Sequence, residues 1–345
     1  MKSDDRFYQH VRGFLTVYLP KNRCYSQNTT KAYRDTLNLF RHFLQEEKAT
    51  PFTHIRFDMI NHTLIQEFLA WMQNTRGCEA ATKNHRLAVL KSFFRYCAFE
   101  DPALIAIYMD IQNVRSQKVV RNRVEFMSET VLKTLLEQPD PHTRRGLRDR
   151  FFMILLYDTG ARVQEILDLR LKDLSLGDKT PCVYLTGKGN KTRLVPLMDK
   201  TMAHLQEYLA WFHPDGDRKS DQYLFYTWIK GKMTKMSADN VSCFLKRYAA
   251  AAHQVCSEVP LRMHAHLFRH TRAMHLYQAG IPLSYIKDFL GHVSINTTDI
   301  YASTDTSMMR AALEKMDKPG AEPASRVEPV WQEDEEMILK LCGLR

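Results

Sequence analysis

Apolar residues recur at helical spacing along the first third of this chain. They form three stripes, which are Tyr33, Leu37, Phe40 and Leu44, then Leu64, Phe68, Trp71 and Met72, then Leu87, Leu90, Phe94 and Cys97. Residues 28–30 offer N-caps for the first stripe, and Thr82 offers one for the third. The pattern predicts an N-terminal domain built from helices.

The second half of the chain combines helical stripes with one alternating segment. The helices that we expect there span residues 128–136, 151–157, 202–212, 238–252, 266–278 and 282–290. Cys182–Leu185 and Thr192–Pro196 have strand character, and the glycines between them predict a hairpin. The expected fold class is therefore mainly α with a small β-sheet.

Two breaks in the pattern suggest the domain boundaries. Residues 110–123 lose the helical periodicity and contain no acid after Asp110, so they resemble a basic interdomain linker. A second linker at 318–323 leads to a segment in which Met337, Ile338, Leu341 and Leu344 would share one helix face. We expect a helical domain at 1–115, a linker at 116–124, a second domain at 125–318 and an acidic tail at 319–345.

The charge distribution points to a polyanionic partner. The formal net charge is +10, but residues 319–345 carry a net −3, so the preceding 318 residues carry +13. Nucleic acid is the leading candidate for such a partner. The polar side of the third helix carries Lys83, Arg86, Lys91 and Arg95, and the linker carries Arg115, Lys118 and Arg121. On the helix, a solvated face and a phosphate-binding face remain open alternatives.

Cysteine spacing and hydropathy indicate the cellular compartment in which we expect the protein. The seven cysteines form no Cys-x-x-Cys pair and no zinc-like spacing with histidine, which suits reduced thiols. The N-terminus leads into no apolar signal segment, and no apolar run of about 18 residues occurs. We therefore expect a soluble cytoplasmic protein without a membrane partner.

Several residues suit chemistry on a phosphodiester. Its cleavage needs fixed cations for the phosphoryl oxygens and a proton for the departing oxygen. Arg162 follows a glycine turn at a helix start, and Arg269 shares a helix face with His266, three positions earlier. Lys188 lies at the tip of the expected hairpin, and Tyr301 offers a phenol as nucleophile.

Each of these residues also has an ordinary structural interpretation. Arg162 and Glu165, at i and i+3, could form a surface ion pair, and Lys188 could be a turn lysine. His266 or His292 alone is more often a packed or capping histidine, and Tyr301 is one of fifteen tyrosines. The order and spacing of the whole set favour the chemical interpretation.

Four segments together resemble the tyrosine recombinase family, which includes phage integrases and Xer-like site-specific recombinases. They are residues 160–165, 186–197, 266–270 and 290–301. The resemblance is strong over residues 123–318, and residues 1–115 resemble the helical, SAM-like core-binding domain of the family. Gln164 stands where serine is common, and Phe268 stands where leucine is common.

The resemblance implies a role for each residue of the set. Tyr301 would attack the scissile phosphate and form a 3′-phosphotyrosyl bond, while Arg162 and Arg269 would hold the non-bridging oxygens. Lys188 would protonate the leaving 5′ oxygen. His266 would take the tyrosine proton or bind phosphate, His292 would hydrogen-bond the phosphate, and Glu165 would orient Arg162. No metal and no other cofactor would be needed.

By the same resemblance, four protomers would synapse two DNA sites and exchange strands through a Holliday junction in a bacterial, nucleoid-associated enzyme. An accessory directionality factor is a further expected partner, and the tail would dock on a neighbouring subunit. Because the predicted helices begin close to Met1, we expect no arm-binding domain. Integration or excision of a mobile element is the favoured role. Xer-like dimer resolution, relaxation as in type IB topoisomerases, and DNA-binding regulation without catalysis are the alternatives.

Overall fold

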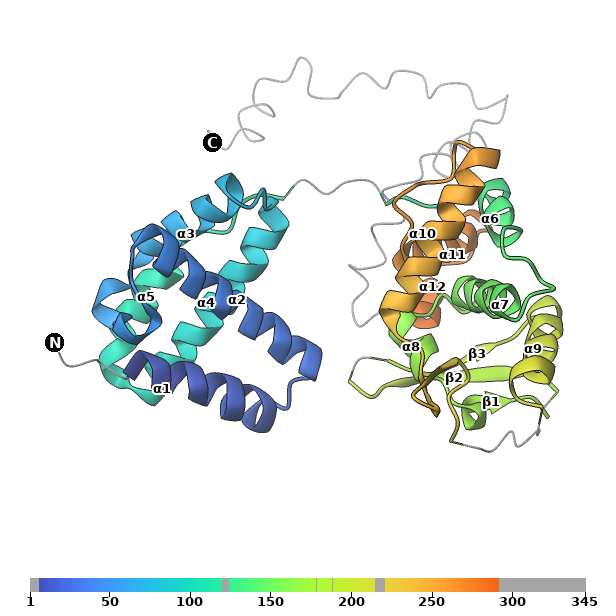
Figure 1. Ribbon diagram of the computed structural model, residues 1–345, viewed down its shortest axis with the longest axis horizontal. Coiled ribbons are helices and arrows are strands. Elements are labelled where there is room, and N and C mark those ends of the chain that lie inside the picture. Colours follow the sequence, from blue (N-terminus) through green and yellow to red (C-terminus); the bar gives the residue numbers. More distant parts are fainter. Residues whose placement is uncertain (1–5, 120–123, 178, 188, 215–220, 292–345) are drawn as a thin grey trace, which may run out of the picture. The chain divides into compact units, whose positions relative to one another are not determined.

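The chain divides into two compact units, residues 1–121 and 122–345, and the division falls inside the predicted linker (Figure 1). The computed structural model describes residues 6–119, 124–177, 179–187, 189–214 and 221–291. Lys188, His292, Tyr301, Arg121 and the predicted tail lie outside the described residues.

Unit 1 is helical throughout. Its helices are α1 (Arg6–Gly13), which continues into a π-helical segment (Phe14–Asn22), α2 (Gln27–Glu47), α3 (His62–Asn74), α4 (Ala80–Glu100) and α5 (Ile105–Gln112), with short 3-10 turns at Phe52–His54, Phe57–Met59 and Pro102–Leu104. The three predicted stripes lie on α2, α3 and α4. Aromatic residues of different stripes contact each other, as Phe40 and Phe68 do, edge to face, with ring centroids 5.3 Å apart.

Two predicted helix starts in unit 1 were wrong by a few residues. The Oγ of Ser26 caps α2 by accepting a hydrogen bond from the Thr29 N–H, so the helix begins before residues 28–30. The helix α4 begins at Ala80 without a side-chain cap. Alanine is the strongest helix former, which explains why Ala80 and Ala81 extend the helix beyond Thr82.

Unit 2 packs seven helices of the described residues around two small sheets. Its elements are α6 (Glu129–Leu136), α7 (Arg144–Thr159), α8 (Val163–Asp168), a 3-10 turn (Leu171–Asp173), β1 (Leu174–Ser175), β2 (Cys182–Thr186), β3 (Thr192–Pro196), α9 (Asp199–Phe212), β4 (Tyr226–Ile229), β5 (Lys232–Lys235), α10 (Ala238–Val255), α11 (Ala265–Gln278) and α12 (Leu283–Leu290). In Figure 1 the three-stranded sheet lies at the lower edge of this unit, below α7 and α8.

The predicted hairpin is confirmed as β2 and β3. The strands pair antiparallel in the order β1-β2-β3, with Leu185 opposite Arg193. The Gly187 N–H donates to the Lys191 carbonyl at 2.8 Å and closes the turn that contains position 188. The second hairpin, β4–β5, was not predicted, because its second strand (Lys-Met-Thr-Lys) lacks a clear apolar alternation.

The expected fold class, mainly α with small antiparallel sheets, is confirmed. The core of unit 2 forms around α7, where Phe151, Phe152 and Leu156 are each 2% exposed or less. None of the helices in the described ranges combines the length and apolar character that a membrane crossing needs.

Candidate active site

Arg269 is fixed against the ends of two other helices. Its side chain on α11 is buried, with 1% of its surface exposed. Its Nη1 donates to the Gly160 carbonyl and its Nη2 to the Leu290 carbonyl, each at 2.7 Å. These carbonyls belong to the C-terminal ends of α7 and α12, where a cation also meets the negative end of the helix dipole. The guanidinium therefore has one well-defined position.

Arg162 is the N-cap residue of α8 and follows Gly160 by two positions. Gly160 ends α7 in the left-handed conformation, at φ +55, which lets the chain reverse before Arg162. The Glu165 carboxylate accepts the Arg162 backbone N–H at 3.0 Å and the Arg162 Nη1 at 2.8 Å. The two arginines are thus both anchored around Gly160, as expected for a pair that binds one phosphate.

Glu165 is buried and serves two arginines. Its side chain is 3% exposed, and its Oε2 also accepts the Arg193 Nη2 at 2.8 Å. Burial raises the pKa of this carboxyl, but the hydrogen bond and charge of Arg193 and the hydrogen bonds from Arg162 outweigh it, and the net shift of the pKa is downward. The alternative of a surface ion pair between Arg162 and Glu165 is therefore wrong, because the carboxylate is inside the protein.

The predicted hairpin turn lies directly against this carboxylate. A Cβ at Gly187 would stand 2.8 Å from the Glu165 Oε1 and 3.7 Å from the Arg162 Nη1. Only glycine fits this approach without displacement. Gly187, the residue before Lys188 in the sequence, therefore lies against Glu165 and beside Arg162.

The end of α12 approaches the same place from the other side. The Arg193 Nε donates to the Phe289 carbonyl at 3.0 Å. Gly291 ends the helix at φ +66, and a Cβ there would stand 3.3 Å from the Arg193 Cδ. Position 292 follows Gly291 directly, so Arg193 contacts the residue that precedes His292.

His266 lies at the surface of α11, one helix turn before Arg269. The protein atoms around its ring lower the pKa of His266 by desolvation, and the charges of Arg269 and Arg162 lower it further. A neutral imidazole can accept a proton, which is what the expected role requires. The ring of His270 packs edge to face against it, with centroids 5.2 Å apart.

The described part of the site can bind an oxyanion and accept a proton. Five elements of unit 2 converge on it: the end of α7, the start of α8, the β2–β3 turn, α11 and the end of α12. Arg162, Glu165, His266 and Arg269 are brought together here, whereas Lys188, His292 and Tyr301 lie outside the described residues. Within the described ranges, no three His, Cys, Asp or Glu side chains gather to hold a metal ion.

Arg193 belongs to this site but is not among the residues that the sequence predicted for it. The alternation of β3 contained the signal. Val195 faces the core, so Arg193, two positions earlier, must face the same side. An arginine at an inward strand position needs a buried partner, and Glu165 is that partner.

The basic residues predicted on α4 are less open than expected. Lys83 is 2% exposed, and its ammonium donates to the Gln73 side chain. The Arg86 Nη1 donates to the Thr36 Oγ1 at 2.8 Å, and the Lys91 Nζ donates to the Val114 carbonyl at 2.7 Å. The prediction of a basic face open to a ligand is therefore wrong for Lys83, whose ammonium is buried and hydrogen-bonded inside unit 1. Arg86 and Lys91 each use part of their hydrogen-bonding capacity within unit 1.

Arg95, Arg115 and Lys118 are exposed, and DNA contact by them stays a prediction. The chain that leads to the linker is attached to α4. Asn84 donates to the Gln117 carbonyl at 2.8 Å and accepts the Gln117 N–H at 2.9 Å. This pair fixes the direction in which residues 115–118 leave unit 1.

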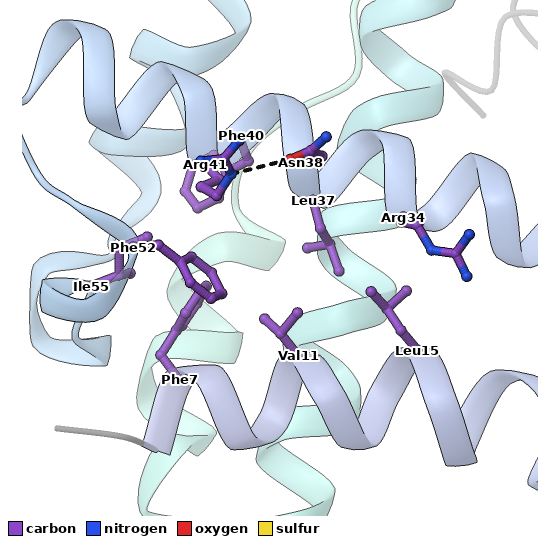
Figure 2. A pocket seen from close by; sticks show the side chains of 10 residues that line it. All are labelled: Phe7, Val11, Leu15, Arg34, Leu37, Asn38, Phe40, Arg41, Phe52 and Ile55. Atoms are coloured by element: carbon purple, nitrogen blue, oxygen red, sulfur yellow. Dashed lines mark hydrogen bonds between the residues drawn. The ribbon is translucent and has the colours of Figure 1, made fainter.

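Unit 1 also contains an apolar groove of about 250 Å³. Figure 2 shows Val11 of α1 and Leu15 of the following π-helical segment facing Leu37 of α2 across it, with Arg41 donating to Asn38 at its edge. Its lining has no nucleophile and no acid, so we assign no chemistry to it.

Comparison with known proteins identifies the family. Residues 125–308 match the phage integrase family, and residues 13–100 match the phage integrase N-terminal SAM-like domain. The chain belongs to the phage integrase family. It is a tyrosine recombinase, the class of enzyme that the four sequence motifs indicated.

Relatives of the whole chain carry two kinds of name. An integrase/recombinase of Sinorhizobium fredii, y4rC, is 31% identical over 92% of this chain and 94% of its own length. The tyrosine recombinase XerC of Staphylococcus carnosus is 27% identical over 87% of this chain and 94% of its own length. The fold is similar to that of the XerH site-specific recombinase bound to a palindromic difH substrate, with a TM-score of 0.65 and 23% identity over 92% of this chain and 90% of that one.

Proposed function

We propose that this recombinase cleaves and rejoins duplex DNA at specific sites through a 3′-phosphotyrosyl intermediate formed by Tyr301. The observation that carries the proposal is the anchoring of Arg162 and Arg269 around Gly160, beside the turn that leads to Lys188. Glu165 holds the Arg162 guanidinium, and the Gly160 and Leu290 carbonyls hold that of Arg269. Two such fixed cations suit the non-bridging oxygens of a phosphodiester.

The residues divide the reaction between them. The Tyr301 oxygen bonds to phosphorus while the bond to the 5′ oxygen breaks. His266 accepts the phenolic proton, and Lys188 gives a proton to the leaving 5′ oxygen. Arg162, Arg269 and His292 stabilise the charge on the phosphoryl oxygens. Attack by a 5′ hydroxyl reverses these steps, so the phosphotyrosine conserves the bond and no cofactor is consumed.

Strand exchange between two sites requires more than one active site. We propose a homotetramer on two synapsed DNA sites, with a Holliday junction between the two rounds of exchange and an accessory factor that sets direction. The cytoplasm, at the nucleoid, is the proposed compartment. Exposed Arg95, Arg115 and Lys118 would contribute contacts to the DNA backbone, which position the protein without reading sequence.

Integration and excision of a mobile element is the biological role that we favour, and the relative named integrase/recombinase supports it. Similarity to XerC supports dimer resolution as the second candidate. The two roles differ in substrate. An element integrase recombines the paired ends of its element, whereas a resolvase acts on the single site repeated in a replicon dimer.

A plasmid assay tests the proposed reaction. Supercoiled plasmids with two copies of a candidate site, taken from the DNA flanking the gene or from a replicon terminus, are incubated with the protein without metal. Site-dependent exchange of the intervening segment is expected. Relaxation of plasmids that lack any site, without exchange, would instead identify a topoisomerase-like activity and contradict the proposal.

A further inference from the structure

The β4–β5 hairpin presents an exposed tip that the proposed catalysis does not use. Lys230 and Gly231 connect the strands with φ values of +50 and +73, the two positive angles of a tight hairpin turn. Trp228 and Ile229, just before this turn, are 62% and 57% exposed. A large aromatic side chain left this open on an ordered hairpin suggests a binding surface.

The hairpin is attached to α8, the helix whose N-cap residue is Arg162. The Lys235 Nζ on β5 lies 2.6 Å from the Asp168 Oδ1, near the end of α8. Gln164, one turn earlier on α8, also donates to Asp168, at 3.0 Å. Tyr226, which pairs with Lys235 across the two strands, is buried and donates to the Phe212 carbonyl at 2.8 Å, so the base of the hairpin is fixed in unit 2.

The surroundings of the hairpin are positively charged. Thr227 borders a cavity of about 320 Å³ that is also lined by Arg145, Arg148 and Arg247. The acid within this cavity, Asp149, is fully buried and already paired with Arg148 and Arg247. Lys230 and Lys232 add two exposed lysines at the tip. The positive charge of this surface therefore complements the phosphates of a nucleic-acid backbone.

We propose that the hairpin tip, residues 228–232, binds duplex DNA beside the cleavage point, with Lys230 and Lys232 on phosphates and Trp228 packed on sugar and base edges. Lysines and an exposed aromatic residue are a common combination for backbone contact with local packing. This inference rests on the proposed function, because the duplex that the tip binds is the DNA that the proposed active site cleaves.

Tryptophan fluorescence of the full chain reports the contact directly. The probe is a mixed-sequence duplex of about 30 base pairs, titrated at low salt where backbone contacts dominate. Trp211 on α9 is 51% exposed and serves as the matched control. We expect DNA to quench the wild type and W211F, and the quenching to be lost in W228F. Full quenching in W228F would overturn the proposal.

Salt dependence tests the lysines independently. In K230A/K232A, the slope of log binding constant against log salt should fall by about two, and the affinity at low salt should drop at least about fivefold. The control K133A alters an exposed lysine on α6 that pairs with Glu137. A slope equal to that of the wild type in K230A/K232A would overturn the phosphate contacts. A change in oligomeric state without a change in DNA affinity would show that the tip binds protein.

The two proposals can fail separately. If the wild type forms no covalent DNA complex but Trp228 still reports binding, the phosphotyrosine chemistry is wrong and the hairpin contact stands. If the covalent complex forms at the wild-type rate in W228A and in K230A/K232A with unchanged affinity, the hairpin contact is wrong and the chemistry stands.

Discussion

The Arg193 guanidinium on β3 donates from Nη2 to the Glu165 Oε2 on α8 at 2.8 Å. The other oxygen of this carboxylate holds Arg162, and the Nε of Arg193 holds the Phe289 carbonyl near the end of α12. This buried ion pair thereby connects the β2–β3 hairpin, Arg162 and the end of α12. We regard Glu165 and Arg193 as positioning residues for the groups that would touch DNA.

Replacing Glu165 with alanine should destabilise unit 2 and slow DNA cleavage. It leaves the nearly buried Arg193 without its carboxylate, and breaking such a pair from one side costs about 3 kcal/mol or more. The free energy of unfolding, measured in urea, should fall by this amount. The control Glu207→Ala on α9, an exposed acid, should change it by less than about 0.5 kcal/mol.

This contribution should depend on pH in a defined direction. The folded-state pKa of Glu165 lies below its ordinary value of 4.5, so its stabilisation is present above pH 4.5 and is lost as pH falls through the folded pKa. The difference between the wild type and Glu165→Ala should shrink in strong acid. A constant difference across this range would show that the carboxylate is not ionised in the folded protein.

Replacing Arg193 with methionine should reduce the rate of covalent complex formation more than the affinity for DNA. Methionine preserves much of the volume but removes the hydrogen bonds to Glu165 and Phe289, and misplacement of about 1 Å costs up to about 100-fold in rate. Single-turnover kinetics separates the two effects. Leu194→Ala, an exposed position on the same strand, should behave as the wild type, and equal losses in both variants would contradict the assigned role.

Replacing Gly187 with alanine should displace the turn that carries Lys188. The new methyl group would stand 2.8 Å from the Glu165 Oε1, so either the turn or the carboxylate must shift. We expect cleavage to slow at least about tenfold while the protein remains folded. Gly177→Ala, where a Cβ meets no atom within 4 Å, is the matched control and should retain full activity.

His270 should make the protein less stable in mild acid. Desolvation, together with the charges around it, lowers the pKa of His270 from 6.5 to about 4. Between these values the unfolded chain binds a proton that the folded chain does not, so stability should fall as pH decreases through this range. His270→Asn should flatten the dependence, measured by urea unfolding. The control His142→Asn, which replaces an exposed histidine, should leave the pH dependence of stability unchanged.

The sequence predicted the arginines of the site better than the contacts that position them. Arg162, His266 and Arg269 stand in recognisable local patterns, a glycine turn and an i, i+3 pair on one helix face. Their partners are remote in sequence. The Arg269 hydrogen bonds reach Gly160 and Leu290, 109 and 21 positions away, and no periodicity encodes such tertiary distances.

Surface charge was the least predictable property. The spacing on α4 places Lys83 and Arg86 on its polar side, yet Lys83 is buried because the Gln73 side chain offers it an acceptor. A long aliphatic stem lets a lysine lie along an apolar surface when its ammonium finds such a partner. The exposure of a lysine therefore depends on neighbours from other helices, which helical periodicity does not specify.

Trapping the covalent intermediate shows directly whether Tyr301 is the nucleophile. The protein is incubated with nicked duplex DNA carrying a candidate site, so that the cut fragment diffuses away and rejoining is blocked. After denaturation, we expect a protein–DNA adduct whose modified peptide contains Tyr301, and no adduct in Tyr301→Phe. An adduct of undiminished yield in Tyr301→Phe, or one located on another residue, would contradict this expectation.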